Sequence, residues 1–241
     1  MPGQIMNDAS RVAHTLAALR ALGLERVESA DVALDAVYLD AKAWQVTAER
    51  PAMGTLVSLV ALGSSRDQLE EAVTRSLESM QRLIGVLTRY DASSPVSHLN
   101  ATGRLLTPPP ELRDVLSTAL EYHRLTQGTF DVSVAPLVDL FRDRLVRASP
   151  VEPTAVEVAE AISRVGGEHI ALSRRRIDLG RHGMRLTLDG IAKGYIVDAI
   201  SAVLDRALLH QRENDAATDG RNALGNLRHN YLITLKVFTL C

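Results

Sequence analysis

The spacing of apolar residues changes several times along the chain, and each change predicts an element. Leucines and alanines recur at helical spacing over residues 8–22, where Asn7 or Asp8 can cap an amphipathic helix and Gly23 can end it. Residues 30–43 fit a helix and a strand equally well.

From Trp44 onward the pattern is different. The segments 44–49 and 54–62 are alternating or rich in β-branched residues, which predicts two adjacent strands with Pro51 in the turn between them. A long helix should follow, capped by Ser64 or Ser65. Its apolar stripe predicts a buried face made of Leu69, Val73, Leu77, Leu83 and Ile84.

The rest of the chain contains further helices and short strands. In chain order the patterns predict a loop over 88–107, a helix over 109–126, a helix from Thr154 to Gly166, strands over 169–173, 176–179 and 184–188, and a helix from Asp189. Strands and helices are grouped rather than alternating, so the sequence predicts an α+β fold.

Composition excludes several function classes. The chain has 241 residues, a net charge of -2 and 4% aromatic residues, so neither a basic surface nor a stacking platform points to nucleic acid. Its one cysteine, Cys241, excludes a disulfide framework and a cysteine-based zinc site. No stretch approaches the roughly 18 apolar residues of a membrane span.

The most distinctive segment is LTLDGIAKGY, where a predicted strand enters a helix through a glycine-flanked turn. Helix N-termini carry unpaired N–H groups and partial positive charge, so such a turn can bind phosphate. Gly190 and Gly194 permit close approach to the backbone, and Lys193 adds a positive charge. Taken without any resemblance, the spacing favours the alternative, a tightly packed strand–helix junction whose lysine is solvated.

Two other segments contain candidate ligand-binding residues. Asp131 lies between apolar neighbours in GTFDVSVAPL, so either donors such as backbone N–H groups or a ligand fix its carboxylate, or it caps a following helix. The segment from Thr88 to Asn100 contains Tyr90, several hydroxyls and an amide that can hydrogen-bond a ligand. An ordinary surface loop has the same composition.

The order and spacing of these segments resemble one known family. Trp44 precedes Met53-Gly54-Thr55, a long helix follows, and then come TRYDASSPVSHLN, GTFDVSVAPL and a strand leading into GIAKGYIVD. This order is similar to that of the ApbE family of FAD:protein FMN transferases. The resemblance implies an ApbE-like (T-fold-like) mixed α/β domain whose C-terminal part is missing.

The resemblance also implies a reaction and a site. Such enzymes bind FAD, use Mg²⁺, cleave the pyrophosphate, transfer FMN to a threonine or serine hydroxyl of a target flavoprotein and release AMP. Carried over by position, the residues in contact with FAD would be Met53, Tyr90, Thr129, Phe130, Asp131, Thr187 and Lys193. The backbone carbonyl of Gly190 would be one metal ligand.

This chain departs from the family pattern at the turn. The common form is LDLGGIAKG, so Thr187 stands in place of an aspartate and Asp189 adds a carboxylate. The form TLDGIA is similar to TLNGIA, which is found in a sub-branch associated with nitrous-oxide reductase maturation. A specialised flavin donor for an electron-transfer partner is therefore expected.

A second departure concerns the end of the chain, where the family's NxGGD and DP-x-TG segments are not found after Asp205. We expect a helical extension over 1–43, an incomplete transferase domain over 44–205 and a divergent tail over 206–241. Two functions stay open: an FMN transferase, or an inactive remnant or non-enzymatic maturation or binding partner. The family implies a periplasmic location, whereas the N-terminal sequence, which lacks a recognisable signal peptide, favours the cytoplasm.

Overall fold

The computed structural model describes residues 34–39, 43–145 and 151–219. The helix predicted over residues 8–22 and the end of the predicted tail, residues 220–241, lie outside these ranges. Two compact units form: one contains the described residues up to Met80 and from Val197, and the other contains Gln81–Ile196. We refer to them as unit 1 and unit 2.

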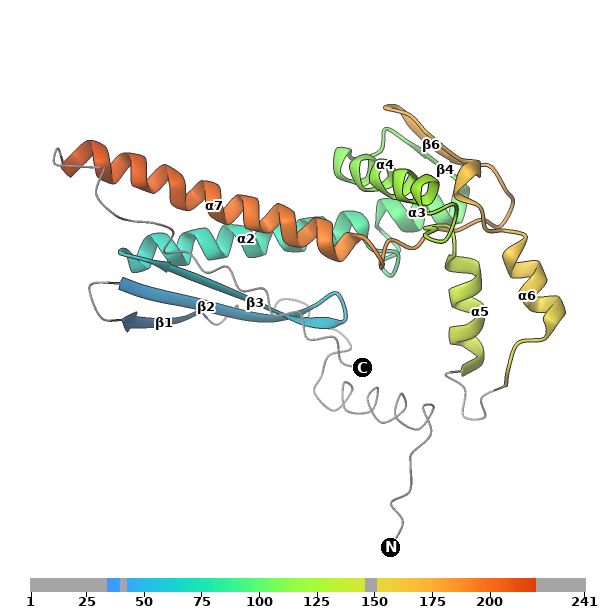
Figure 1. Ribbon diagram of the computed structural model, residues 1–241, viewed down its shortest axis with the longest axis horizontal. Coiled ribbons are helices and arrows are strands. Elements are labelled where there is room, and N and C mark those ends of the chain that lie inside the picture. Colours follow the sequence, from blue (N-terminus) through green and yellow to red (C-terminus); the bar gives the residue numbers. More distant parts are fainter. Residues whose placement is uncertain (1–33, 40–42, 146–150, 220–241) are drawn as a thin grey trace, which may run out of the picture. The chain divides into compact units, whose positions relative to one another are not determined.

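Unit 1 contains an antiparallel sheet with the strand order β1-β2-β3. Its strands are β1 (Leu34–Leu39), β2 (Ala43–Ala52) and β3 (Thr55–Gly63). Val46 pairs with Ala61 and Ala48 with Leu59, and all four side chains are buried, so one face of the sheet belongs to the core. Figure 1 shows α2 and α7 on one side of this sheet.

The predicted strand pair is confirmed, but the turn between the strands is not where it was predicted. Met53 and Gly54 form the two-residue turn and both have positive φ, 54° and 70°, as a type I′ hairpin requires. Pro51 lies inside β2, opposite Leu56, so its predicted place in the turn is wrong. It lies beyond Ala48, the last β2 residue paired with β1, where a missing N–H is tolerated.

Two long helices are shared by the two units: α2 begins in unit 1 and ends in unit 2, and α7 begins in unit 2 and ends in unit 1. Helix α2 (Arg66–Leu87) confirms the predicted long helix, and α7 (Ala192–Asp219) follows the glycine-flanked turn. The predicted face of α2 is buried at Leu69, Val73, Leu77 and Leu83 and half-buried at Ile84.

Helix α7 buries Ile196, Ile200 and Leu204, which recur every four residues on one face. It continues to Asp219, into the segment 206–241 that was expected to be a divergent tail. None of the helices in the described ranges is long and apolar enough to cross a membrane.

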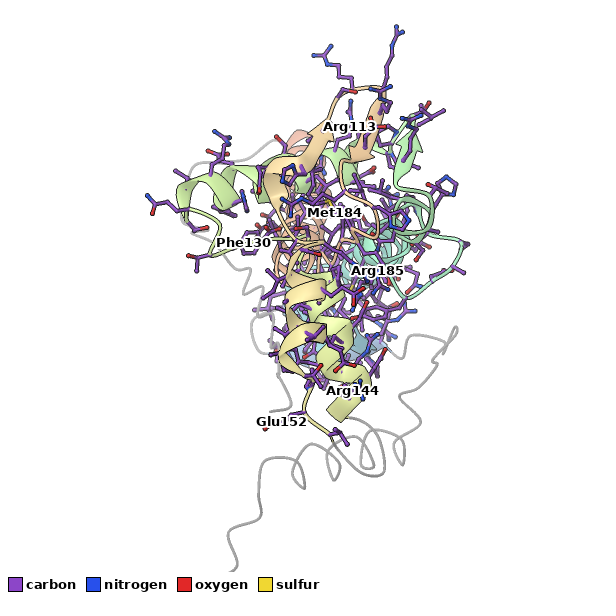
Figure 2. All side chains as sticks on the ribbon, turned by 90° about the vertical axis from the view of Figure 1, so that its right-hand side faces the viewer. Arg113, Phe130, Arg144, Glu152, Met184 and Arg185 are labelled. Atoms are coloured by element: carbon purple, nitrogen blue, oxygen red, sulfur yellow. The ribbon has the colours of Figure 1, made fainter. Side chains whose placement is uncertain are left out.

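Unit 2 contains the remaining helices and a second antiparallel sheet. The helices are α3 (Pro95–Thr102), α4 (Pro110–Leu125), α5 (Ala135–Leu145), α6 (Ala155–Ile162) and the short 3-10 helix η1 (Gly167–His169). The sheet has the order β4-β6-β5, from β4 (Arg104–Leu106), β6 (Arg176–Leu179) and β5 (Ile170–Leu172). Helices α5 and α6 pack side by side, as Figures 1 and 2 both show.

The loop predicted over residues 88–107 is wrong, because α3 and β4 lie within it. The helix is specified by its ends: the Ser94 side chain accepts a hydrogen bond from the Ser97 N–H, and Pro95 occupies the first turn. Gly103 ends the helix with a φ of 72°, a left-handed conformation that glycine adopts without strain. These capping signals outweigh the weak apolar period of the segment.

Candidate functional site

The segment before α7 is extended but is not a strand, so the strand predicted over 184–188 is wrong. Only Arg185 forms a bridge, an isolated parallel one with Val134. The Leu186 N–H donates to Asn100 Oδ1 (2.7 Å), and Asn100 Nδ2 donates to the Leu186 carbonyl (2.9 Å). The Thr187 N–H donates to the Val132 carbonyl (2.8 Å). A side chain and a loop therefore satisfy the backbone groups that a neighbouring strand would otherwise pair.

The chain then turns into α7. The N–H groups of Ile191 and Ala192 both donate to the Leu188 carbonyl, at 2.9 and 2.7 Å. The two residues enclosed by this turn, Asp189 and Gly190, are exposed. A Cβ on Gly190 would lie 3.6 Å from Phe130 Cε2, so the Phe130 ring borders the turn. An exposed helix N-terminus beside an aromatic ring can accept a phosphate together with a flat ring.

Tyr90 approaches the turn from the end of α2. Its hydroxyl donates to Asp189 Oδ2 (2.7 Å), and the Arg89 guanidinium lies 5.0 Å from the Tyr90 ring centroid. Partial burial of the hydroxyl end and this hydrogen bond to Asp189 raise the pKa of Tyr90, so the hydroxyl remains a donor at neutral pH. The residue is 66% exposed, which leaves the ring available to a ligand.

Arg89, whose guanidinium lies beside the Tyr90 ring, belongs to an ion-pair cluster centred on the buried carboxylate of Asp139. Asp139 accepts hydrogen bonds from both terminal nitrogens of Arg89, at 2.8 and 3.1 Å. Arg142 and Arg185 lie 2.9 and 3.0 Å from its oxygens. Burial alone would raise the pKa of Asp139, but the bonds from Arg89 and the charges of all three arginines hold it below its usual value.

Within the described ranges, each arginine of this cluster has a carboxylate partner, and one donor of Arg89 stays unused. Three guanidinium groups share Asp139, and Asp189 Oδ2 lies a further 3.8 Å from Arg89 Nε. That Nε–H is buried and has no hydrogen-bond partner among the described residues. Asp143 Oδ1 likewise lies 3.8 Å from Arg142 Nε, so three carboxylates balance the three arginines, and the buried Nε–H of Arg89 is the donor that the cluster offers to a ligand at the turn.

The carboxylate of Asp131 is held by the protein itself. Its Oδ1 accepts from the Ser133 N–H (2.7 Å) and hydroxyl (2.6 Å), and Oδ2 accepts from the Gly167 N–H (2.9 Å). Helix α5 begins at Ala135, so Asp131 is not its cap. Of the explanations left open by the sequence, backbone donors therefore account for this residue.

The structure brings most of the predicted site residues to one place. Tyr90, Phe130 and Gly190 lie at the turn, Thr187 is 8% exposed just before it, and Asp131 follows Phe130. Figure 2 labels Phe130 and, at the start of the segment, Met184 and Arg185. The other three residues are an exposed Thr129, a half-buried Lys193 in the first turn of α7, and Met53, which belongs to unit 1. The contacts of these residues with FAD stay predictions.

Sequence reasoning missed the Arg89–Asp139 pair. A signal was present, because Asp139 lies between apolar residues in PLVDLF, the same pattern that drew attention to Asp131. Its partner Arg89 was part of a recognised segment but is 50 positions away, so the pairing depends on the tertiary fold.

Comparison with known proteins finds relatives of one kind. A family model described as the ApbE family matches residues 53–212. The chain is 26% identical over 127 residues to the FAD:protein FMN transferase of Haemophilus influenzae, covering 50% of this chain and 37% of that protein. With the Salmonella typhimurium protein of the same name it shares 24% identity over 169 residues, 66% of this chain and 47% of that protein. It thus spans about half or less of these relatives' length.

Solved structures show the same fold. The flavin transferase ApbE of Vibrio cholerae superposes with a TM-score of 0.59 at 24% identity, covering 68% of this chain and 54% of that one. The ApbE protein of Thermotoga maritima gives 0.61 at 23% identity, with 68% and 53% covered. The apo flavinyl transferase ApbE of Pseudomonas stutzeri gives 0.57 at 20% identity, with 74% and 56% covered. The predicted ApbE-like mixed α/β fold is confirmed.

Proposed function

The chain belongs to the ApbE family, and on this premise we propose that it binds FAD at the turn before α7 and transfers the FMN part to a hydroxyl group of a target protein. One observation supports this most strongly. Tyr90, Phe130 and an exposed helix N-terminus meet at Asp189 and Gly190, next to the buried Nε–H of Arg89, which has no partner among the described residues. Aromatic rings, unused donors and the partial positive charge of a helix N-terminus together suit a flavin nucleotide.

Each group would have a distinct part in binding. The N-terminus of α7 and Lys193 would attract the pyrophosphate, since both are positive. The exposed ring of Tyr90 offers a face on which a flat heterocycle can stack, and its hydroxyl would orient a polar group. Arg89 is fixed by Asp139, so its charge stays close to the turn without rearrangement.

The donor atoms of the turn fit Mg²⁺ in part. Magnesium is usually held by one or two carboxylates together with substrate phosphates and water. Asp189 provides a carboxylate, and the neighbouring Gly190 provides a backbone carbonyl, both exposed. Mg²⁺ held there would supply neutralisation of the charge that develops on the pyrophosphate oxygens. The hydrogen bond from Tyr90 would keep the Asp189 carboxylate at this position.

The reaction we propose exchanges one phosphorus–oxygen bond for another. The acceptor oxygen of a serine or threonine forms a bond to the FMN phosphorus, the pyrophosphate bond of FAD breaks, and AMP leaves. The hydroxyl proton passes to a base. The proposed partner is a flavoprotein. If the chain belongs to the sub-branch associated with nitrous-oxide reductase maturation, this flavoprotein acts in electron transfer. The names of the relatives support flavin transfer, and the sequence resemblance supports the acceptor, the leaving group and the metal ion.

A second candidate is FAD binding without transfer, in an inactive relative or a non-enzymatic maturation or binding partner. Within the described part of the chain, Asp189 is the one carboxylate in the turn from Leu188 to Ile191. One carboxylate is the lower limit for magnesium. Binding and transfer must therefore be measured separately.

We would titrate the purified chain with FAD, with and without Mg²⁺, and follow flavin fluorescence. Tighter binding with Mg²⁺ in the parent, lost in Asp189→Asn but kept in Asp198→Asn, would support the proposed metal position. Asp198 is an exposed aspartate on α7 and serves as the matched control. Label transferred from FAD to an acceptor protein would identify the enzyme. FAD binding alone would favour the second candidate, and no FAD binding in either condition would contradict both.

A further inference from the structure

A histidine on α4 lies between two carboxylates. His123 Nδ1 is 3.2 Å from the Phe130 carbonyl and 3.3 Å from Asp131 Oδ2. On the other side of the ring, Nε2 is 3.4 Å from Glu168 Oε2. The His123 side chain is 14% exposed and that of Glu168 is 59% exposed, so the cluster is accessible from the Glu168 side.

The partners of Nδ1 determine what Nε2 can do. Both neighbours of Nδ1 are oxygen acceptors, so the Nδ1 position carries the ring hydrogen. In the neutral imidazole Nε2 then presents a lone pair, and it faces a carboxylate oxygen of Glu168, which also presents lone pairs. Two lone pairs repel each other unless a cation lies between them. That cation is either a proton or a metal ion.

The surroundings hold the imidazole in place. Asp131 accepts three hydrogen bonds from Ser133 and Gly167, so its carboxylate is a fixed support for Nδ1. A Cβ on Gly167 would lie 2.9 Å from His123 Nδ1, and one on Gly166 would lie 2.8 Å from Glu168 Oε1. Gly167 therefore lets the backbone approach the imidazole more closely than a residue with a Cβ would without a shift of the ring, whereas the exposed Glu168 carboxylate could move away from a Cβ at Gly166.

We propose that His123 Nε2 and Glu168 bind a divalent transition-metal ion, Zn²⁺ being the best fit, with Asp131 orienting the imidazole from behind. A carboxylate that accepts the second ring N–H is the usual support of a metal-binding histidine. Ligands about 2.0–2.1 Å from a tetrahedral ion lie about 3.3–3.4 Å apart, close to the distance of 3.4 Å between Nε2 and Oε2.

Neighbouring groups provide further donors. His169 Nε2 lies 3.2 Å from Glu168 Oε1, on the opposite oxygen of the same carboxylate. Asp131 belongs to the same cluster, in which ligand atoms of His123, Asp131 and Glu168 lie within 4.8 Å of one another, but its Oδ2 already faces Nδ1 and the Gly167 N–H. Imidazole nitrogen favours zinc over magnesium. This zinc site uses different donor atoms from the magnesium position proposed at the turn, and it does not depend on flavin transfer.

The test is a Zn²⁺ titration of the purified full chain by calorimetry, repeated with Co²⁺, whose visible absorption reports tetrahedral coordination. We expect the parent to bind one more ion than Glu168→Gln and His123→Gln, and His98→Gln to behave like the parent. His98 is an exposed histidine of unit 2 outside this cluster, so it controls for nonspecific binding to imidazole. Asp131→Asn should weaken the same site by about 10- to 100-fold.

Glu168 is exposed, so its substitution by glutamine leaves the fold intact, which equal melting temperatures of parent and variant in EDTA would verify. If Glu168→Gln retains the stoichiometry and affinity of the parent, a proton rather than a metal ion lies between Nε2 and Glu168. That result would overturn the proposal, and so would a parent that binds no Zn²⁺.

Discussion

Replacing Asp139 by asparagine tests how much the buried ion-pair cluster stabilises unit 2. Asp139 is 5% exposed and is the shared partner of Arg89, Arg142 and Arg185. Asparagine keeps one oxygen acceptor but removes the negative charge, so three guanidinium groups would lose the carboxylate they share. Arg89 and Arg142 would be left with pairs at 3.8 Å, with Asp189 and Asp143. Removing one partner of a buried pair costs about 3–5 kcal/mol. The Arg142 and Arg185 side chains are 47% and 43% exposed and can turn to water, so we expect about 3 kcal/mol.

The assay is urea denaturation followed by circular dichroism. Asp143→Asn is the matched control, because Asp143 lies on the same helix and also pairs with Arg142, at 3.8 Å, but with a 69% exposed side chain. An exposed pair contributes little, so its loss should change stability by less than about 0.5 kcal/mol. The double variant Arg89→Met, Asp139→Leu should recover part of the loss, since apolar side chains can replace a buried pair at little cost. A cost for Asp139→Asn no greater than that for Asp143→Asn would refute the reasoning.

Two further predictions concern acid stability and the segment before α7. Because the pKa of Asp139 is lowered in the folded protein, its contribution is present above the unfolded value, about 3.9, and is lost as pH falls through the folded value. Thermal melts from pH 6 downward should therefore show a shallower acid loss in Asp139→Asn than in the parent, and parallel curves would contradict the assignment. Asn100→Ala should cost about 1–3 kcal/mol for each Leu186 backbone group left unpaired, and should speed exchange of the Leu186 amide hydrogen. His98→Ala on the same helix is its control, and equal exchange rates in the two variants would count against this role of Asn100.

The elements with a strong local period were predictable from the sequence. Helix α2 has a continuous apolar stripe, and strands β2 and β3 alternate or are β-branched, so both were found with nearly correct bounds. The hairpin turn was misplaced because Pro51 is a common turn residue, whereas Met53 is a non-glycine residue at positive φ. Helix α3 was missed because its end caps, rather than its apolar period, specify it.

The residues of the candidate site were predictable only where they belong to the segments that resemble the family. Tyr90, Phe130 and Gly190 came from the order of the segments, and the structure places all three at the turn. The contact of Asn100 with Leu186 joins residues 86 positions apart, and nothing local in the sequence indicates it. The strand predicted over 184–188 failed for the same reason, because an asparagine side chain replaces the partner strand.

The contacts at the turn form one continuous series that links stability to binding. Asp139 on α5 fixes Arg89, the Arg89 guanidinium lies against the Tyr90 ring, and the Tyr90 hydroxyl holds Asp189. Both terminal nitrogens of Arg89 donate to Asp139, and its buried Nε–H, 3.8 Å from Asp189, has no hydrogen-bond partner among the described residues. A ligand anion at the turn would find that donor already oriented. The free energy needed to bury and orient Arg89 is thus offset by its ion pairs within unit 2 when the protein folds, before any ligand binds. A donor that is oriented in this way is the condition for a preorganised anion site.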